Sequence, residues 1–338
     1  MNLLVTGGCG FIGSNLVRHL RQVRPEWKIV NLDKLTYAGN LENLKDLEHD
    51  AKHVFVRGDI NDKALLAGLF PTHAIDAVMH LAAESHVDRS ILGPEEFIVA
   101  NVLGTQILLE AARAAKVKRF VQVSTDEVYG SLGPTGAFTE TSPLQPSSPY
   151  SASKTSADLI ALAWHHTFGM DVVVTRCSNN YGGFQFPEKL IPLMVDNALK
   201  DKPLPVYGDG ANVRDWLHVE DHCSALLAAL EKGRAGEVYN IGGNSERQNI
   251  QIVKRILELT GKSEALIKYV KDRPGHDRRY AIDPTKIRTE LHWTPKHTFE
   301  QGLEETVKWY VDNRAWVERV TSGAYRAYFE TQYRARLS

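Results

Sequence analysis

The chain has few cysteines, no excess of charge of either sign and no long apolar run. Its three cysteines, Cys9, Cys177 and Cys223, lie far apart and match neither a disulfide framework nor a metal-ligand spacing. We therefore expect reduced thiols, a cytoplasmic protein and no bound metal. No apolar run comes near the roughly 18 residues of a membrane helix, and a strand-like segment follows Met1 where a signal peptide would be basic. We expect no membrane contact.

Basic and acidic residues nearly cancel, since 40 Lys and Arg residues face 41 Asp and Glu residues. A nucleic-acid-binding protein usually carries a basic surplus, so we expect no nucleic-acid partner. An anionic small molecule needs only a few local cations and is not excluded. Apolar residues make up 43% of the chain, which is typical of globular proteins and excludes a disordered or collagen-like chain. The length of 338 residues suggests two domain-sized units.

Short β-branched runs alternate with longer helical patterns through the first 180 residues. This alternation predicts right-handed βαβ units, and hence a Rossmann-type, doubly wound parallel sheet in an α/β fold. We expect strands at 2–6, 28–32, 53–57, 76–80, 119–123 and 171–176, and helices at 11–23, 62–70, 95–115, 150–168, 221–232, 250–260 and 299–313.

The pattern becomes irregular and richer in proline after about residue 180. We therefore expect two parts, of which the first, residues 1–178, contains the parallel sheet. The second, residues 179–338, is expected to be a smaller, mixed C-terminal domain that binds the substrate. Parts of about 212–243 are expected to return to the first sheet.

Three glycines, Gly7, Gly10 and Gly13, follow the first expected strand and open the first expected helix. Such a turn lets a pyrophosphate approach the backbone and the helix N-terminus. Asp33 ends the second expected strand, where a carboxylate binds a ribose hydroxyl and repels a 2′-phosphate. The pattern therefore predicts NAD as the cofactor, ahead of NADP. Asp59 is either an adenine contact or a cap on the third strand.

Tyr150 and Lys154 lie four residues apart at the start of an expected helix, with Ser148 as its cap and Pro149 at its first position. A nearby ammonium lowers the pKa of a tyrosine, so Tyr150 is expected to accept a hydroxyl proton. This spacing is common by chance, so its position beside the strand ends carries the prediction.

Thr125, Asp126 and Glu127 follow the fifth expected strand. Thr125 can bind the substrate oxygen that Tyr150 deprotonates. Repulsion between two adjacent carboxyls can keep one of them protonated, which makes an acid–base pair. The alternative for Asp126 and Glu127 is a solvated acidic turn.

Together these motifs resemble the extended short-chain dehydrogenase/reductase family. The stretches 33–40, 82–90, 124–130, 176–182, 214–219 and 272–280 are similar, within that family, to the dTDP-glucose 4,6-dehydratases. The resemblance extends from residue 2 to about residue 312, and the Thr-Asp-Glu triplet at 125–127 is its most specific part. Sugar-nucleotide epimerases usually lack this acid pair, and related decarboxylases usually have Ser before Glu.

The resemblance implies a lyase that converts dTDP-glucose to its 4-keto-6-deoxy form in deoxysugar biosynthesis, for example that of dTDP-rhamnose. Tyr150, with Lys154 and Thr125, would remove the O4 proton as hydride leaves C4 for NAD. Glu127 would then take the C5 proton while Asp126 protonates the leaving C6 hydroxyl, and hydride would return to C6. Another sugar-nucleotide dehydratase, an epimerase, a decarboxylase and a non-catalytic NAD-binding protein remain alternatives.

The resemblance also implies further contacts with cofactor and substrate. Taken singly, Arg214 fits a structural ion pair as well as a diphosphate contact, and His276 fits a plain loop histidine. The cofactor residues are Gly7, Gly10, Phe11, Ile12, Gly13, Asp33, Lys34, Leu35, Thr36, Asp59, Ile60, Leu81, Ala82, Ala83, Ser85, Ala100, Tyr150, Lys154 and Asn180. The substrate residues are Ser85, Thr125, Asn179, Lys189, Leu190, Pro205, Tyr207, Arg214, Asn249, Asp272, Arg273 and His276.

The expected helices 95–115 and 150–168 carry apolar stripes that look wider than one sheet face requires. We therefore expect a homodimer in which two helices of each subunit form a four-helix interface. The stripe residues are Phe97, Val102, Ile107, Leu108, Ala111, Leu159, Leu162 and Ala163.

Overall fold

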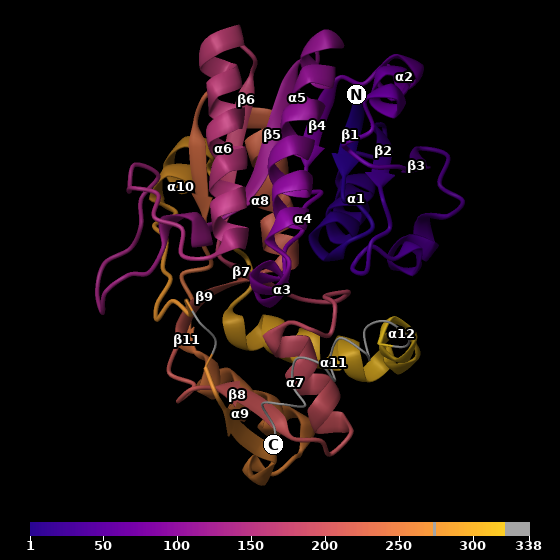
Figure 1. The fold of residues 1–338 in the computed structure, drawn as a ribbon. Helices are drawn as coiled ribbons and strands as arrows, with labels where there is room; N and C mark the ends of the chain where they lie inside the picture. The colour runs from indigo at the N-terminus through magenta and orange to yellow at the C-terminus, as the bar shows by residue number, and fades with distance from the viewer. Residues whose placement is uncertain (273–274, 322–338) are drawn as a thin grey trace.

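A parallel sheet of seven strands forms the centre of the larger part of the computed structural model, which describes residues 1–272 and 275–321. The strand order is β10-β6-β5-β4-β1-β2-β3 (Figure 1). The fold is therefore the doubly wound α/β fold that the sequence predicted. The strands are β1 (Asn2–Thr6), β2 (Lys28–Asp33), β3 (His53–Arg57), β4 (Ala77–His80), β5 (Arg119–Thr125), β6 (Val172–Cys177) and β10 (Val238–Ile241).

Helices cover both faces of this sheet because successive strand side chains point to opposite sides. Leu3 and Val5 of β1 belong to one core cluster and Leu4 to another. The first cluster includes side chains of α1 (Phe11–Val23), α8 (Val219–Lys232) and α10 (Thr285–Leu291). The second includes side chains of α2 (Lys63–His73), α5 (Gly104–Ala114) and α6 (Pro149–Phe168).

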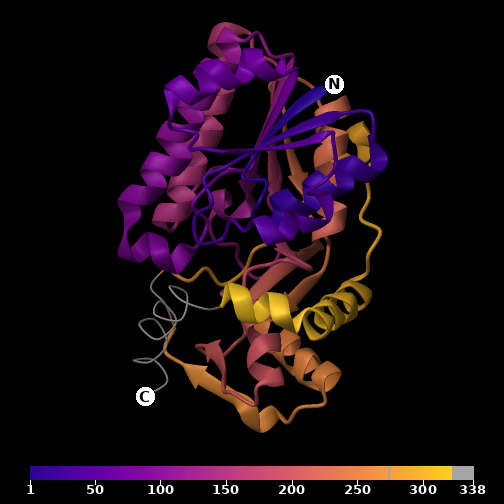
Figure 2. The ribbon, with the colours of Figure 1, turned by 90° about the vertical axis from the view of Figure 1, so that its right-hand side faces the viewer.

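The smaller part lies beyond one end of the large sheet (Figures 1 and 2). It contains a mixed three-stranded sheet, β11-β9-β7, and the pair β12-β8. Its helices share an apolar core of their own. Its elements are β7 (Asn179–Tyr181), α7 (Leu190–Leu199), β8 (Leu204–Tyr207), β9 (Val213–His218), β11 (Glu246–Gln248), α9 (Asn249–Thr260), η4 (Glu264–Leu266), β12 (Ile267–Val270), α11 (Phe299–Asp312) and α12 (Arg314–Val320).

The sequence predicted one helix over 95–115, and the chain is helical from Pro94 to Ala114, although the middle of this stretch is not α-helical. The chain forms α4 (Pro94–Phe97), the π-helix η2 (Ile98–Leu103) and then α5. The wider π turn accompanies a buried Asn101, whose Nδ2 donates to Glu84 O at 2.9 Å and Ser153 Oγ at 2.8 Å. This polar bridge ties the loop after β4 to α6. The remaining short helices are η1 (Leu41–Leu47), α3 (Val87–Leu92) and η3 (Asp126–Tyr129).

Within the described residues, the stretch Pro94–Ala114 alone is long and apolar enough to cross a membrane by length and composition. Phe97, Ile107 and Leu108 of this stretch are almost fully buried in the protein. The stretch also packs against α2 and α6. These contacts are those of a core helix.

A buried ion pair fixes α6 to the sheet. Arg176 Nε of β6 lies 3.0 Å from Asp158 Oδ2 of α6, and both side chains are almost inaccessible to solvent. Arg176 Nη1 donates to the hydroxyl of Tyr129, and that hydroxyl donates to Asn240 Oδ1. Because unpaired buried charges are costly, this network favours one position of α6 relative to β5 and β6.

Candidate active site

A cavity of about 900 Å³ opens at the carboxyl ends of the strands of the large sheet. Its wall includes residues that follow β1, β2, β4, β5 and β6, together with part of the 185–189 segment that leads into α7. In open α/β sheets, ligands bind at this edge of the sheet. The cavity is therefore the candidate active site.

The glycine turn after β1 fits a dinucleotide. Gly7 has φ +71°, and a Cβ there would lie 2.7 Å from Ala82 N. A Cβ on Gly13 would lie 2.1 Å from Gly7 O, so α1 packs directly on the turn. Gly10, which precedes α1, provides no side-chain hydrogen bond to the first helical turn. The backbone N–H groups of that turn are thus suited to a phosphate.

Asp33 is held in place at the end of β2. Its Oδ2 accepts from Cys9 N at 2.9 Å, and its Oδ1 accepts from Leu35 N at 2.8 Å. Burial raises its pKa, while these two hydrogen bonds oppose the rise. Each carboxylate oxygen keeps acceptor capacity for a ribose hydroxyl, as the sequence predicted for NAD.

Asp59 caps the turn after β3 and also lines the cavity. Its Oδ1 accepts from Asn61 N at 2.9 Å, and its Oδ2 lies 2.7 Å from Lys34 Nζ. Burial alone would raise the pKa of Asp59, but the bonds from Lys34 and Asn61 lower it overall. The capping interpretation is confirmed, and the adenine contact stays a prediction.

Two adjacent carboxyls begin η3, directly after β5. Thr125 caps this turn by accepting from Glu127 N at 3.2 Å. Asp126 is 2% exposed, so the alternative of a solvated acidic turn is wrong for this residue. Its Oδ2 is buried and has no hydrogen-bond partner among the described residues. Most buried carboxyl oxygens are hydrogen-bonded, so this oxygen lacks the usual compensation for its burial.

The pKa of Asp126 is well above its usual range. Burial is the main cause, and the nearby carboxylates of Glu127 and Asp215 add to it. Arg214 opposes the rise without cancelling it. Asp126 thus retains a proton more readily than an exposed aspartate, as the sequence predicted for one member of the pair.

Tyr150 and Lys154 begin α6, and its N-terminus is built as predicted. Ser148 and Ser151 form a capping box, and Pro149 occupies the first turn. The helix thereby presents Tyr150 and Lys154 to the cavity from one face. Lys154 Nζ donates to Val123 O at 2.7 Å.

The prediction of a lowered pKa for Tyr150 is wrong. Burial raises this pKa well above 10, and Glu127 and Cys177 raise it further. The hydroxyl of Thr125 opposes the rise only in part. Burial also lowers the pKa of Lys154, whose ammonium is directed at a backbone carbonyl. The surroundings of Tyr150 therefore favour its neutral phenol.

Most predicted site residues line this one cavity, although they come from distant parts of the chain. Those brought together are Gly7, Gly10, Phe11, Ile12, Gly13, Asp33, Lys34, Thr36, Asp59, Ile60, Leu81, Ala82, Ala83, Ser85, Ala100, Thr125, Asp126, Glu127, Tyr150, Lys154, Asn179, Asn180 and Lys189.

Other predicted residues lie outside the cavity wall. Leu35 packs into the core beside it, and Arg214 is buried behind it, donating to Asp277 O and covering the ring of Tyr280. Pro205, Leu190 and Asn249 belong to β8, α7 and α9 of the smaller part. Arg273 lies outside the described residues.

Tyr207, Asp272 and His276 form a separate polar cluster in the smaller part. The Tyr207 hydroxyl donates to Asp88 Oδ2 at 3.0 Å, and His276 Nδ1 lies 2.6 Å from Asp272 Oδ1. The ring of His276 meets that of Tyr207 edge-on. Their predicted contact with a nucleotide stays a prediction.

The sequence analysis missed several residues of the cavity wall, among them Tyr37, Arg89 and Glu188. The Tyr37 hydroxyl donates to Glu188 Oε1 at 3.0 Å, and the Arg89 guanidinium lies 3.7 Å from the centre of the Tyr37 ring. Tyr37 and Arg89 lie in stretches that carried the resemblance, so a signal was present. Glu188 follows a proline and precedes Lys189, with no motif to mark it.

Comparison with known proteins agrees with this geometry. The family model described as GDP-mannose 4,6 dehydratase matches residues 4–306. A dTDP-glucose 4,6-dehydratase of Xanthomonas campestris pv. campestris (strain B100) is 57% identical, over 96% of this chain and 97% of that protein. The solved dTDP-glucose 4,6-dehydratase of Bacillus anthracis, in complex with NAD, is 54% identical with a TM-score of 0.89, over 95% of this chain and 99% of that one. The dTDP-glucose 4,6-dehydratase of Streptomyces venezuelae, also solved with NAD, is 51% identical with a TM-score of 0.92. The match covers 95% of this chain and 100% of that one.

A Rossmann-type sheet with a Tyr–Lys pair beside a dinucleotide turn defines a short-chain dehydrogenase/reductase of the extended type. Within that class the chain belongs to the sugar-nucleotide 4,6-dehydratase family, and its full-length relatives are dTDP-glucose 4,6-dehydratases. The resemblance inferred from the motifs is confirmed.

Replacing Asp33 with asparagine tests the cofactor site. The amide in Asp33→Asn lacks the negative charge of the ribose acceptor, and a charged hydrogen bond contributes about 1.5–3 kcal/mol, so NAD should bind about 10- to 100-fold more weakly. Calorimetric titration of the two proteins with NAD measures this change. Asp201→Asn, on the exposed surface, is the control. An unchanged affinity in Asp33→Asn would remove Asp33 from the site.

Proposed function

We propose that the protein converts dTDP-glucose to dTDP-4-keto-6-deoxyglucose as an NAD-dependent hydro-lyase. The observation that carries this proposal is the position of Asp126 and Glu127 beside Tyr150 and Lys154 in one cavity. Oxidation at one carbon needs a proton acceptor and a hydride acceptor. Loss of water from the adjacent carbons needs an acid and a base as well, and the cavity contains both sets of groups.

The oxidation step is assigned to Tyr150, which takes the proton of the sugar O4 hydroxyl at its phenolic oxygen. Bound NAD supplies the acceptor for the C4 hydride and later the donor for C6. Thr125 hydrogen-bonds the reacting oxygen, and Lys154 stabilises negative charge on Tyr150.

The elimination step is assigned to the two carboxyls. A ketone at C4 acidifies the C5 hydrogen, which Glu127 removes as a base. Asp126, whose pKa is raised by burial, donates its proton to the C6 hydroxyl as water leaves. The unpartnered Oδ2 of Asp126 is the oxygen from which we infer this donation.

A sugar-nucleotide epimerase or decarboxylase is less well supported by the same site. Such reactions begin with the same oxidation but do not eliminate water, so they have no use for a protonated Asp126. In an epimerase or a decarboxylase, the raised pKa of Asp126 would therefore serve no step of the reaction.

Binding of the nucleotide sugar is assigned mainly to the smaller part, residues 179–338, as the sequence predicted. Lys189 and Asn179 line the cavity, and the Oδ1 of Asn179 has no partner among the described residues. Tyr207, Asp272 and His276 are proposed to meet the nucleotide. Residues 1–178, with α8 and β10, are proposed to hold NAD.

A homodimer is proposed on the outer face of η2 and α6. Ile98 and Leu103 of η2 and Leu159 of α6 are between 48% and 53% exposed. These helices form an outer layer of the molecule (Figure 2). Three residues of the predicted stripe, Phe97, Ile107 and Leu108, are instead buried in the subunit core.

The cytoplasm is proposed as the location of the protein. The three cysteines are buried as free thiols, and burial raises the pKa of Cys9 to about 12. Unpaired thiols suit a reducing compartment.

Asp126→Asn and Glu127→Gln test the elimination step. Loss of one acid–base partner typically lowers the rate by about 10² to 10⁴. Turnover, measured as formation of the 4-keto sugar from dTDP-glucose, should fall by that factor in each variant. NAD binding and the unfolding transition should be unchanged, and the exposed Glu48→Gln should match the unaltered protein. Full turnover in the double variant would refute the assignment.

Leu103→Glu combined with Leu159→Glu tests the dimer. Two carboxylates in an apolar interface lose their hydration, so the variant should sediment as a monomer at micromolar concentration while the unaltered protein sediments as a dimer. Val311→Glu, at a site of similar exposure on α11, is the control. A dimer that persists in the double variant would place the interface elsewhere.

A further inference from the structure

Two histidines and a carboxylate converge where the smaller part meets α8. His218 ends β9 and precedes α8, Glu220 lies in the first turn of α8, and His297 precedes α11. One ligand atom from each of these residues lies within 4.8 Å of the other two. None of the three residues lines the active-site cavity.

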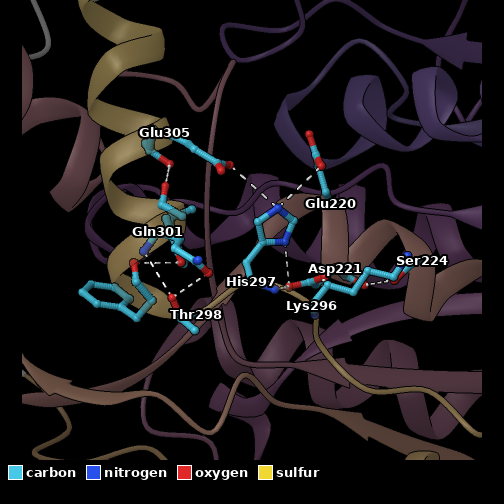
Figure 3. A network of polar contacts seen from close by, with 12 residues as sticks. Glu220, Asp221, Ser224, Lys296, His297, Thr298, Gln301 and Glu305 are labelled. Atoms are coloured by element: carbon cyan, nitrogen blue, oxygen red, sulfur yellow. Dashed lines mark hydrogen bonds and ion pairs between the residues drawn. The ribbon is translucent and has the colours of Figure 1, made fainter.

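His297 is oriented like a metal ligand (Figure 3). Its Nδ1 lies 3.0 Å from Asp221 Oδ2, and both oxygens of Asp221 also accept backbone N–H groups of Lys296 and His297. A carboxylate that fixes Nδ1–H directs the Nε2 lone pair outward, as around zinc in many proteins. That Nε2 lies 3.8 Å from a carboxylate oxygen of Glu220 and of Glu305, beyond hydrogen-bond distance.

His218 supplies an independent observation. The residue is only 7% exposed, yet its Nδ1 is buried with no hydrogen-bond partner among the described residues. Its ring lies against that of His297, with centroids 4.1 Å apart.

We propose that His218, His297 and Glu220 bind a divalent transition-metal ion of the Zn²⁺ class, with Glu305 in reach as a fourth ligand. In a tetrahedral site with bonds of about 2.1 Å, ligand atoms lie roughly 3.4 Å apart, so the group must contract by an ångström or so. The two glutamates can make this adjustment because their side chains are more than half exposed.

The bound ion would have a structural role. It would join the start of α8, which covers the large sheet, to the start of α11 in the smaller part. The sequence analysis expected no metal because the cysteines lack a ligand spacing. The ligands proposed here come from separate segments, 218–220 and 297, which no short spacing connects.

The test uses the NAD-loaded, untagged protein after treatment with a chelator, titrated with Zn²⁺ against a chromophoric competitor. We expect one saturable site per chain, and Co²⁺ should give the intense visible bands of a four-coordinate ion. His297→Gln, which removes the imidazole ring, and Glu220→Gln should each weaken binding at least about tenfold. Both variants should fold, because neither Glu220 nor His297 is a buried side chain. A substitution of the buried His218 is avoided for this reason.

His49→Gln, at an exposed histidine far along the chain from the site, should bind Zn²⁺ like the unaltered protein. Absence of saturable binding would overturn the proposal. Binding that persists unchanged in His297→Gln, or that His49→Gln weakens equally, would also overturn it and would leave the two rings as a packing contact. Dehydratase turnover is not the readout, so this result is independent of the proposed reaction.

Discussion

Burial of ionisable groups at the carboxyl end of β5 is the constraint on which the rest of the site depends. Asp126, Tyr150 and Lys154 are each less than a tenth exposed, and burial is the main cause of the pKa shift of all three. In water an aspartate is ionised at neutral pH, whereas a tyrosine is a phenol. Burial favours the uncharged carboxyl of Asp126 and the phenol of Tyr150, and the ammonium of Lys154 donates to a backbone carbonyl.

The parallel sheet provides this environment because its strands end at one edge, where a turn or a helix covers each group. The buried pair of Arg176 and Asp158 fixes α6 relative to β6, and Asn101 fixes the loop after β4 relative to α6. These two contacts together hold the start of α6 in a fixed position beside β5. The same edge carries the glycine turn and Asp33, so the cofactor groups and the acid–base groups share one cavity.

Much of the fold was predictable because strand and helix periods and capping residues are local properties. The six early strands end within two residues of their predicted positions, and Ser148 and Pro149 marked the start of α6 correctly. The π-helix was not predictable, since it accompanies a tertiary bridge from Asn101 to Ser153. The pKa of Tyr150 was predicted in the wrong direction because spacing reveals a neighbouring lysine but not the depth of burial. The places of Glu188 and of the His218–His297 pair were not predictable, because they are defined by contacts between residues far apart in the sequence and no motif marks them.

The central claim is that one cavity performs two separable steps, oxidation at C4 and elimination across C5 and C6. Rapid mixing of NAD-loaded Asp126→Asn with dTDP-glucose, followed by the absorbance of reduced nicotinamide, tests it most directly. We predict that the reduced form appears and persists in this variant, because oxidation proceeds while water cannot leave, and that Tyr150→Phe gives no such signal. If Asp126→Asn turns over at the full rate without accumulation, or if it never reduces the nicotinamide, the two-step assignment is contradicted.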